Sequence, residues 1–170
     1  MSIRSIAAYF PWRRVKVVYH NVVQASRSAL VRLEPDERFH PRCHACGRPA
    51  RTVHSHARKF VRDLSFGECE MLLQVEHRKV WCDSCDKARV EKLDFVQVCE
   101  RITDRLATYA AELCRAGLSV QTVAEHLNLP PKRSKPAIRR SWNARSAGPT
   151  TAAFNTWPST RSPSTKDIPT

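Results

Sequence analysis

Hydrophobic and polar positions along this chain change their period near residue 100. Residues 14–35 contain β-branched runs on both sides of a polar centre, which predicts two short strands. Residues 71–76 alternate in character, with Met71, Leu73 and Val75 forming one apolar face. The turn-like stretch 65–68, "SFGE", precedes this alternation. We therefore expect an antiparallel hairpin in this part of the chain.

Residues 101–129 have a helical period instead. Apolar side chains recur there at spacings of three and four, at Ile102, Leu106, Tyr109 and Leu113. Gly117 is expected to end this helix in the left-handed conformation, and Ser119 to cap a second helix. Two helices joined by a short glycine-containing turn fit the start of a helix-turn-helix, with a plain helical hairpin as the alternative. Pro130, Pro131 and Pro136 are expected to prevent a third helix.

These patterns predict an α+β chain with four regions. Residues 1–39 would form strands that lead into a β-rich domain at 40–99, followed by a partial helix-turn-helix at 100–130. Residues 131–170 are rich in Ser, Thr and Pro and have no apolar period, so we expect a disordered tail.

Charge points to a polyanionic partner. The 170 residues carry a formal net charge of +13, which favours nucleic acid as that partner. The charge is uneven, because residues 131–170 hold eight Lys and Arg and one acid and so contribute +7. The N-terminus resembles no signal peptide and no run is long enough to span a membrane, so we expect a cytoplasmic protein without a membrane partner.

Four of the seven cysteines form two C-x-x-C pairs, Cys43 with Cys46 and Cys82 with Cys85. Thiols in a reducing compartment are more often metal ligands or redox groups than disulfides. Four thiolates brought together across a hairpin suit tetrahedral Zn²⁺, and Gly47 suits a tight turn after the first pair. A redox dithiol or four unconnected core thiols are the alternatives. Cys69, Cys99 and Cys114 are expected to be small buried hydrophobes.

Histidine could replace a cysteine as a ligand, since several histidines lie near the pairs. The candidates are His44, His54, His56 and His77. Each of them could equally be a solvated or phosphate-contacting side chain.

Three segments together resemble a known family: "CHACG", "VHSHARKFVRDLSFGECEMLLQVEHRKVWCDSC" and "LSVQTVAEHLNL". They resemble the N-terminal part of the ISL-three family of insertion-sequence transposases, over roughly residues 15–130. The resemblance implies a four-cysteine zinc finger with Cys43, Cys46, Cys82 and Cys85 as ligands. It also implies a turn element at Arg62-Asp63-Leu64, a helix-turn-helix, and a catalytic domain with a carboxylate triad.

The last 40 residues do not match that family, so we expect its catalytic domain to be missing from this chain. Codon degeneracy over residues 155–170 permits, in a shifted reading frame, a string that resembles the family segment with the first catalytic aspartate. We therefore expect a truncated chain that is out of frame after about residue 130, with an accidental basic tail.

The resulting prediction is a zinc-finger and helix-turn-helix fragment of a transposase, without catalytic activity, that binds terminal inverted repeats in double-stranded DNA. Phosphate contacts are expected from six basic residues, Arg51, Arg58, Lys59, Arg62, Arg78 and Lys79. Backbone contacts are expected from the polar side of the second helix, at Gln121, Thr122 and His126. The first alternative is a protein-interaction module that binds and inhibits full-length transposase. The second is an active enzyme restored by programmed frameshifting.

Overall fold

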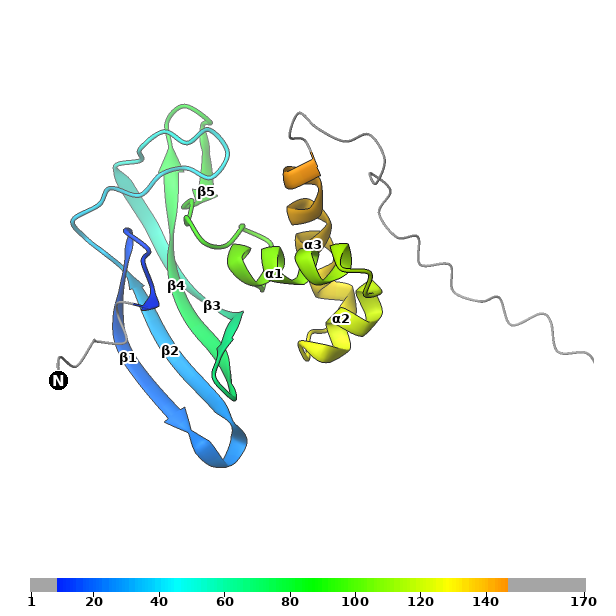
Figure 1. Ribbon diagram of the computed structural model, residues 1–170. Helices are drawn as coiled ribbons and strands as arrows, with labels where there is room; N and C mark the ends of the chain where they lie inside the picture. The colour runs from blue at the N-terminus through cyan, green and yellow to red at the C-terminus, as the bar shows by residue number, and fades with distance from the viewer. Residues whose placement is uncertain (1–8, 147–170) are drawn as a thin grey trace, which may run out of the picture.

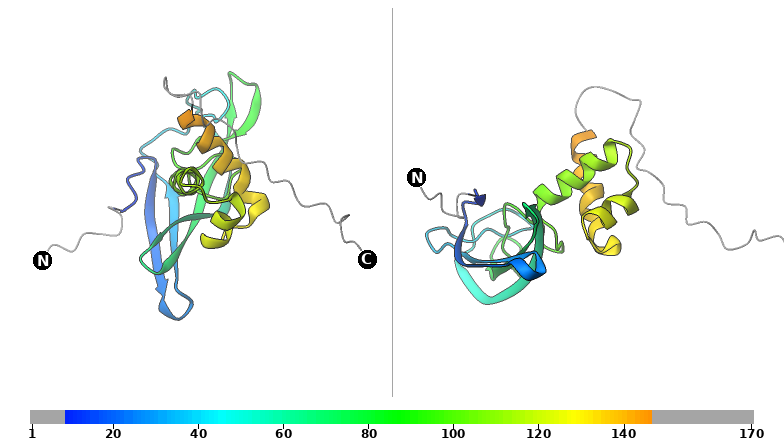
Figure 2. Two further views of the ribbon diagram at one scale, coloured as in Figure 1. Left: turned by 45° about the vertical axis from the view of Figure 1, so that its right-hand side comes forward. Right: turned by 60° about the horizontal axis from the view of Figure 1, so that its bottom comes forward.

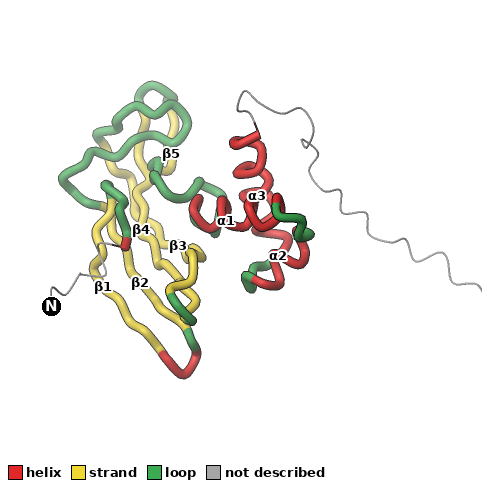
Figure 3. The backbone as a smooth tube through the Cα atoms, viewed as in Figure 1, coloured by secondary structure: helices red, strands yellow, loops and turns green. Residues whose placement is uncertain are grey.

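The structure, a computed structural model, describes residues 9–146. A β-sheet forms one side of the molecule and three helices form the other (Figures 1 and 3). The strands are β1 (Val15–Val23), β2 (Ser28–Pro35), β3 (Thr52–Phe66), β4 (Cys69–Cys82) and β5 (Lys87–Val90), with a short 3₁₀ helix, η2 (Gln24–Ser26), between the first two. The helices are α1 (Asp104–Arg115), α2 (Val120–His126) and α3 (Pro131–Ser146). The mixed α+β class is confirmed, as are the paired N-terminal strands and the hairpin around Gly67.

One curved sheet contains all five strands, in the order β1-β2-β4-β3 with β5 also paired to β4 (Figure 2). Strand β2 runs parallel to β4, while the other strand pairs are antiparallel. Strand β2 is therefore hydrogen-bonded directly to the strand that ends at Cys82, the first residue of the second cysteine pair.

The buried face of β4 changes along its length. Met71, Leu73 and Val75 are buried in its first half, and Arg78, Val80 and Cys82 in its second half. Successive side chains of a strand point to opposite faces of the sheet. The change from odd to even buried positions therefore means that the two halves of β4 bury opposite faces. The first half packs in the sheet's apolar cluster, which Trp12 and Phe95 close by stacking at 4.0 Å between ring centroids.

The helices share a separate apolar cluster. Thr103 caps α1 and Ser119 caps α2, each accepting a hydrogen bond from a backbone N–H three residues later. Gly117 follows α1 with φ of +100°, as predicted. Tyr109, expected on the apolar face, is instead 41% exposed. The cluster contains thirteen buried residues, which are Ile102, Leu106, Ala107, Ala110, Ala111, Cys114, Val120, Val123, Ala124, Leu129, Ala137, Ile138 and Trp142.

The expectation of disorder from residue 131 is wrong for residues 131–146, because they form α3. Pro131 is the first residue of this helix, where its missing N–H costs nothing and its fixed φ suits the helix. Pro136 lies inside the helix and is exposed. Ala137, Ile138 and Trp142 hold the helix against α1 and α2. Residues 147–170 of the predicted tail lie outside the described residues, and the frameshift stays a prediction.

Arg62-Asp63-Leu64 lies within β3 and not in a turn, and it joins the sheet to the helices. Asp63 is 1% exposed and accepts hydrogen bonds from Thr103 Oγ1 at 2.6 Å and Arg105 Nε at 2.7 Å. The Arg62 N–H donates to the carbonyl of Arg101, and the Thr103 N–H donates to the carbonyl of Arg62. A buried carboxylate thus fixes the N-terminus of α1 to β3.

The three cysteines outside the two pairs differ in their exposure. Cys99 is exposed, contrary to expectation, whereas Cys114 is buried and Cys69 is partly buried.

None of the helices in the described part of the chain has the length and apolar character needed to cross a membrane.

Candidate metal centre and nucleic-acid interface

The first cysteine pair lies in a tight turn between β2 and β3. The Gly47 N–H donates to the carbonyl of Cys43 at 2.9 Å, and the Cys43 N–H donates to the carbonyl of Arg48 at 2.9 Å. Gly47 has φ of +73°, in the left-handed region that glycine adopts without strain. The predicted role of Gly47 in this turn is confirmed.

The second pair forms a similar turn between β4 and β5. The Cys85 N–H donates to the carbonyl of Cys82 at 3.1 Å. The next residue, Asp86, has φ of +48°. Each turn therefore places a left-handed residue directly after its second cysteine.

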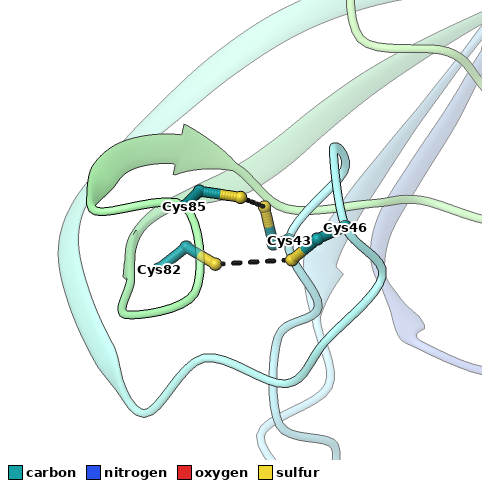
Figure 4. Close-up of side chains that lie close together, drawn as sticks. All are labelled: Cys43, Cys46, Cys82 and Cys85. Atoms are coloured by element: carbon teal, nitrogen blue, oxygen red, sulfur yellow. Dashed lines mark hydrogen bonds between the residues drawn. The ribbon is translucent and has the colours of Figure 1, made fainter.

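Backbone contacts dock the first turn onto β5 and the residues that follow it. Cys43 forms a β-bridge with Glu91, and the His44 N–H donates to the carbonyl of Val90 at 3.2 Å. The Lys92 N–H donates to the carbonyl of Arg42 at 2.7 Å. These contacts bring the two turns face to face at one end of the sheet (Figure 4).

The four sulfur atoms lie within 4.8 Å of one another. Cys43 Sγ is 3.9 Å from Cys85 Sγ, and Cys46 Sγ is 3.5 Å from Cys82 Sγ (Figure 4). Four thiolates around a tetrahedral Zn²⁺, with Zn–S bonds of about 2.3 Å, would be separated by about 3.8 Å. The cluster can therefore hold a metal ion, and its donor set and spacing fit zinc.

Ionisation of these thiols is coupled. Burial opposes ionisation of Cys43, but hydrogen bonds from the backbone N–H groups of Cys46 and Ala45 stabilise its thiolate, and its pKa falls to about 7. The pKa of Cys85 is raised to about 12, chiefly because its thiol hydrogen-bonds to the sulfurs of Cys46 and Cys82. One thiolate thus makes a second one unfavourable, and a divalent cation among the sulfurs would reverse that effect.

The geometry disfavours the alternatives to a metal site. All seven cysteines are free, and the sulfur–sulfur contacts at 3.9 and 3.5 Å each join one C-x-x-C pair to the other. The four thiols are clustered and not unconnected. Among the described residues, the cluster of potential ligands contains only these cysteines. None of the four candidate histidines belongs to this cluster. His44 Nδ1 lies 3.0 Å from the carbonyl of Val90, and His56 pairs with Glu76.

Arg78 does not lie on the surface, contrary to its predicted phosphate contact. Its guanidinium is buried beside Glu91, with Nε donating to Oε2 at 2.9 Å and Nη2 donating to the carbonyl of Phe39 at 3.3 Å. The Arg78 N–H also donates to Glu91 Oε1. Glu91 forms the β-bridge with Cys43, so its pair with Arg78 links the first cysteine turn to β4.

The other predicted phosphate contacts divide into two groups. Arg58 pairs with Glu76, Lys59 donates to the carbonyl of Gln97, and Arg62 donates to the carbonyl of Met71 and pairs with Glu70. Arg51 and Lys79 are exposed beside the cysteine turns. Exposed basic residues that the prediction omitted lie in the same region, namely Arg42, Arg48, Lys87 and Lys92. For Arg42, Arg48 and Lys87, the sequence signal was their position within two residues of a C-x-x-C pair.

The three residues predicted to contact DNA from the second helix are exposed to solvent. Gln121, Thr122 and His126 are all exposed on α2, and Gln121 donates to Glu125 at 3.1 Å. The sequence reasoning missed α3, where Arg139 and Asn143 are exposed one helical turn apart. The four-residue spacing of Ile138 and Trp142 on the buried side was the signal that could have identified this helix.

Comparison with known proteins shows similarity to a transposase. Over 87 residues, the chain is 37% identical to the transposase for insertion sequence element IS1001 of Bordetella parapertussis. The match covers 51% of this chain and 21% of that transposase. The chain is thus related to an insertion-sequence transposase. It spans about a fifth of that relative's length.

Two other comparisons found no match. No protein-family model matches this chain, and no solved structure is significantly similar to it.

Proposed function

We propose that this chain is a DNA-binding module with a role in transposition, held together at one end by zinc. The four-cysteine cluster carries the proposal, because its sulfur spacing fits a structural zinc ion. Cys43, Cys46, Cys82 and Cys85 would hold the ion, which supplies cross-links between the two turns and leaves no position open for catalysis. The relationship to a transposase supports DNA as the partner, with terminal inverted repeats as the proposed target.

The proposed phosphate-binding surface surrounds the zinc-binding turns. Arg51 and Lys79 are exposed there, and neither pairs with an acidic side chain among the described residues. Such cations fix the position of a protein on DNA through phosphate contacts and release counterions when they bind. The arginines paired with Glu70, Glu76 and Glu91 contribute less to this surface.

The proposed base-reading element is α3, with α2 as the first helix of a helix-turn-helix. Four residues separate the two helices, and Asn128 in this turn has φ of +48°. A turn of three or four residues between two helices is typical of the motif. The exposed side of α3 carries Arg139 and Asn143, whose side chains suit contacts with guanine and adenine in the major groove.

Fluorescence anisotropy with the zinc-loaded protein tests this function. The probes are labelled duplexes of inverted repeats found by sequencing the DNA on both sides of the coding sequence. Scrambled duplexes of equal length serve for comparison, and each binding curve is repeated over a range of salt concentrations. We expect tighter binding to the repeats and a steep fall in affinity with salt. The double variant Arg51→Ala/Lys79→Ala should weaken binding to both probes and reduce the salt slope by about 2. Arg139→Ala should weaken binding to the repeats more than binding to the scrambled duplex.

A matched control is Arg27→Ala, which removes an exposed cation at the opposite end of the sheet. This variant should bind as the unmodified protein does. Equal affinity for both duplexes in every protein would contradict base reading by α3. Absence of salt-dependent binding would contradict the proposed function as a whole.

A further inference from the structure

Strand β1 forms an open edge of the sheet with an unusual surface. Among the described residues, β1 pairs only with β2, and its residues 18–23 are all exposed. Several of these side chains are apolar: Tyr19 is 51%, Val22 49% and Val23 44% exposed. Lys16 is the only Lys, Arg, Asp or Glu in the strand, and no proline interrupts it.

The opposite edge of the sheet is protected by features that β1 lacks. Near its C-terminal end, β3 is covered by residues 97–103, through the bridge between Arg62 and Ile102 and the hydrogen bond from Lys59 Nζ to the carbonyl of Gln97. Its uncovered part carries His54, His56 and Arg58. Folded proteins generally cover exposed edges or place charges on them, because an open apolar edge pairs with another strand.

The sequence of β1 is compatible with a second copy of itself. Antiparallel pairing centred on Asn21 would place Tyr19 opposite Val23 and His20 opposite Val22 on the neighbouring copy. Aromatic and β-branched residues are favourable cross-strand neighbours, and no like charges would meet. The irregularity in β1 between Val17 and Tyr19 lies outside these five paired residues.

Symmetry also favours a second copy as the partner. Pairing of two identical edges about a two-fold axis uses both open edges and closes the assembly. The combined sheet would then end at the protected β3 strand of each copy. We propose that two copies of this chain associate through their β1 strands, with residues 19–23 paired antiparallel.

Analytical ultracentrifugation of the zinc-loaded full chain, without DNA, tests this interface. We expect the mass to rise with concentration from 19.4 kDa toward twice that value. In the variant Tyr19→Lys/Val23→Lys, each new lysine would lie opposite a lysine of the other copy. Because these like charges repel, this variant should remain at 19.4 kDa. Mixing it with Tyr19→Glu/Val23→Glu should restore the doubled mass, which a misfolded variant would not do.

The matched control is Val53→Lys, which adds a charge to an apolar residue, 39% exposed, on β3. This variant should associate as the unmodified chain does. A mass of 19.4 kDa at every concentration would overturn the proposal, as would association that persists in the two-lysine variant. Because DNA is absent, either result leaves the proposed DNA binding untouched.

Discussion

The two ends of this molecule are stabilised in different ways. The helical unit has an apolar cluster of thirteen buried residues drawn from α1, α2, α3 and the segments beside them. Residues 41–50 and 82–91, which form the cysteine turns, contribute no side chain to either apolar cluster of the described residues. Backbone hydrogen bonds, the Arg78–Glu91 pair and the four sulfurs hold the turns instead. Order at that end should therefore depend on the metal, and order in the helices should not.

Removal of the metal should give the largest loss of structure, and this loss should be confined to the end that contains the cysteine turns. Chelation, or Cys43→Ser, should unfold the cysteine turns, because structural zinc contributes about 10–16 kcal/mol in small zinc-binding peptides at neutral pH. That contribution is comparable to the whole stability of a small domain, about 5–15 kcal/mol. Amide hydrogen exchange should show lost protection at residues 41–50 and 82–91, with protection retained in α1.

The control for this experiment is Cys99→Ser, since Cys99 is exposed and outside the cluster. Native mass spectrometry should find one zinc per chain in this variant and none in Cys43→Ser. Equal zinc content in both variants would contradict the assigned ligands.

The converse experiment disrupts the helices and leaves the metal in place. Ile138 is fully buried in α3, so Ile138→Ala should lower the free energy of unfolding by about 2–5 kcal/mol through lost burial and a residual cavity. Urea denaturation followed by far-ultraviolet circular dichroism measures this loss. Zinc content should not change. Arg139→Ala, at the exposed neighbouring position, should change stability by less than about 0.5 kcal/mol. Equal stability of the two variants would mean that α3 does not pack as described.

Local patterns in the sequence predicted the parts of this structure that depend on neighbouring residues. The alternation of Met71, Leu73 and Val75 identified the buried face of β4, and Ser119 was correctly predicted to cap α2. The spacing of the C-x-x-C pairs predicted that four thiols would meet. The first two signals lie within a few residues of the features that they predict. The meeting of Cys46 with Cys82 spans 36 residues, and it was predicted from the preference of zinc for four thiolate ligands.

Features that depend on distant contacts were not predictable in the same way. Arg78 resembles a surface cation in sequence, and only its approach to Glu91 explains its burial. Asp63 was recognised within a motif, yet its role depends on Thr103 and Arg105, about 40 residues away. Helix α3 was missed because its prolines were treated as helix breakers. Proline is favourable at the first position of a helix, which is where Pro131 lies.

The smallest predicted effect concerns the residues that follow each cysteine pair. Gly47 and Asp86 occupy equivalent positions with φ of +73° and +48°. An alanine Cβ at Gly47 would meet no atom within 4 Å, so Gly47→Ala should cost only backbone strain, about 1 kcal/mol. Competition with a chelator should reveal this cost as a loss of about fivefold in zinc affinity.

Asp86 provides the comparison for that variant. Asp86→Gly should change zinc affinity little, because relief of backbone strain offsets the greater flexibility of glycine in the unfolded chain. Gly47→Asp should lose less affinity than Gly47→Ala, since aspartate adopts the left-handed conformation more readily than alanine does. If the alanine and aspartate variants lose affinity equally, backbone conformation is not what distinguishes the residues tolerated after the cysteine pairs.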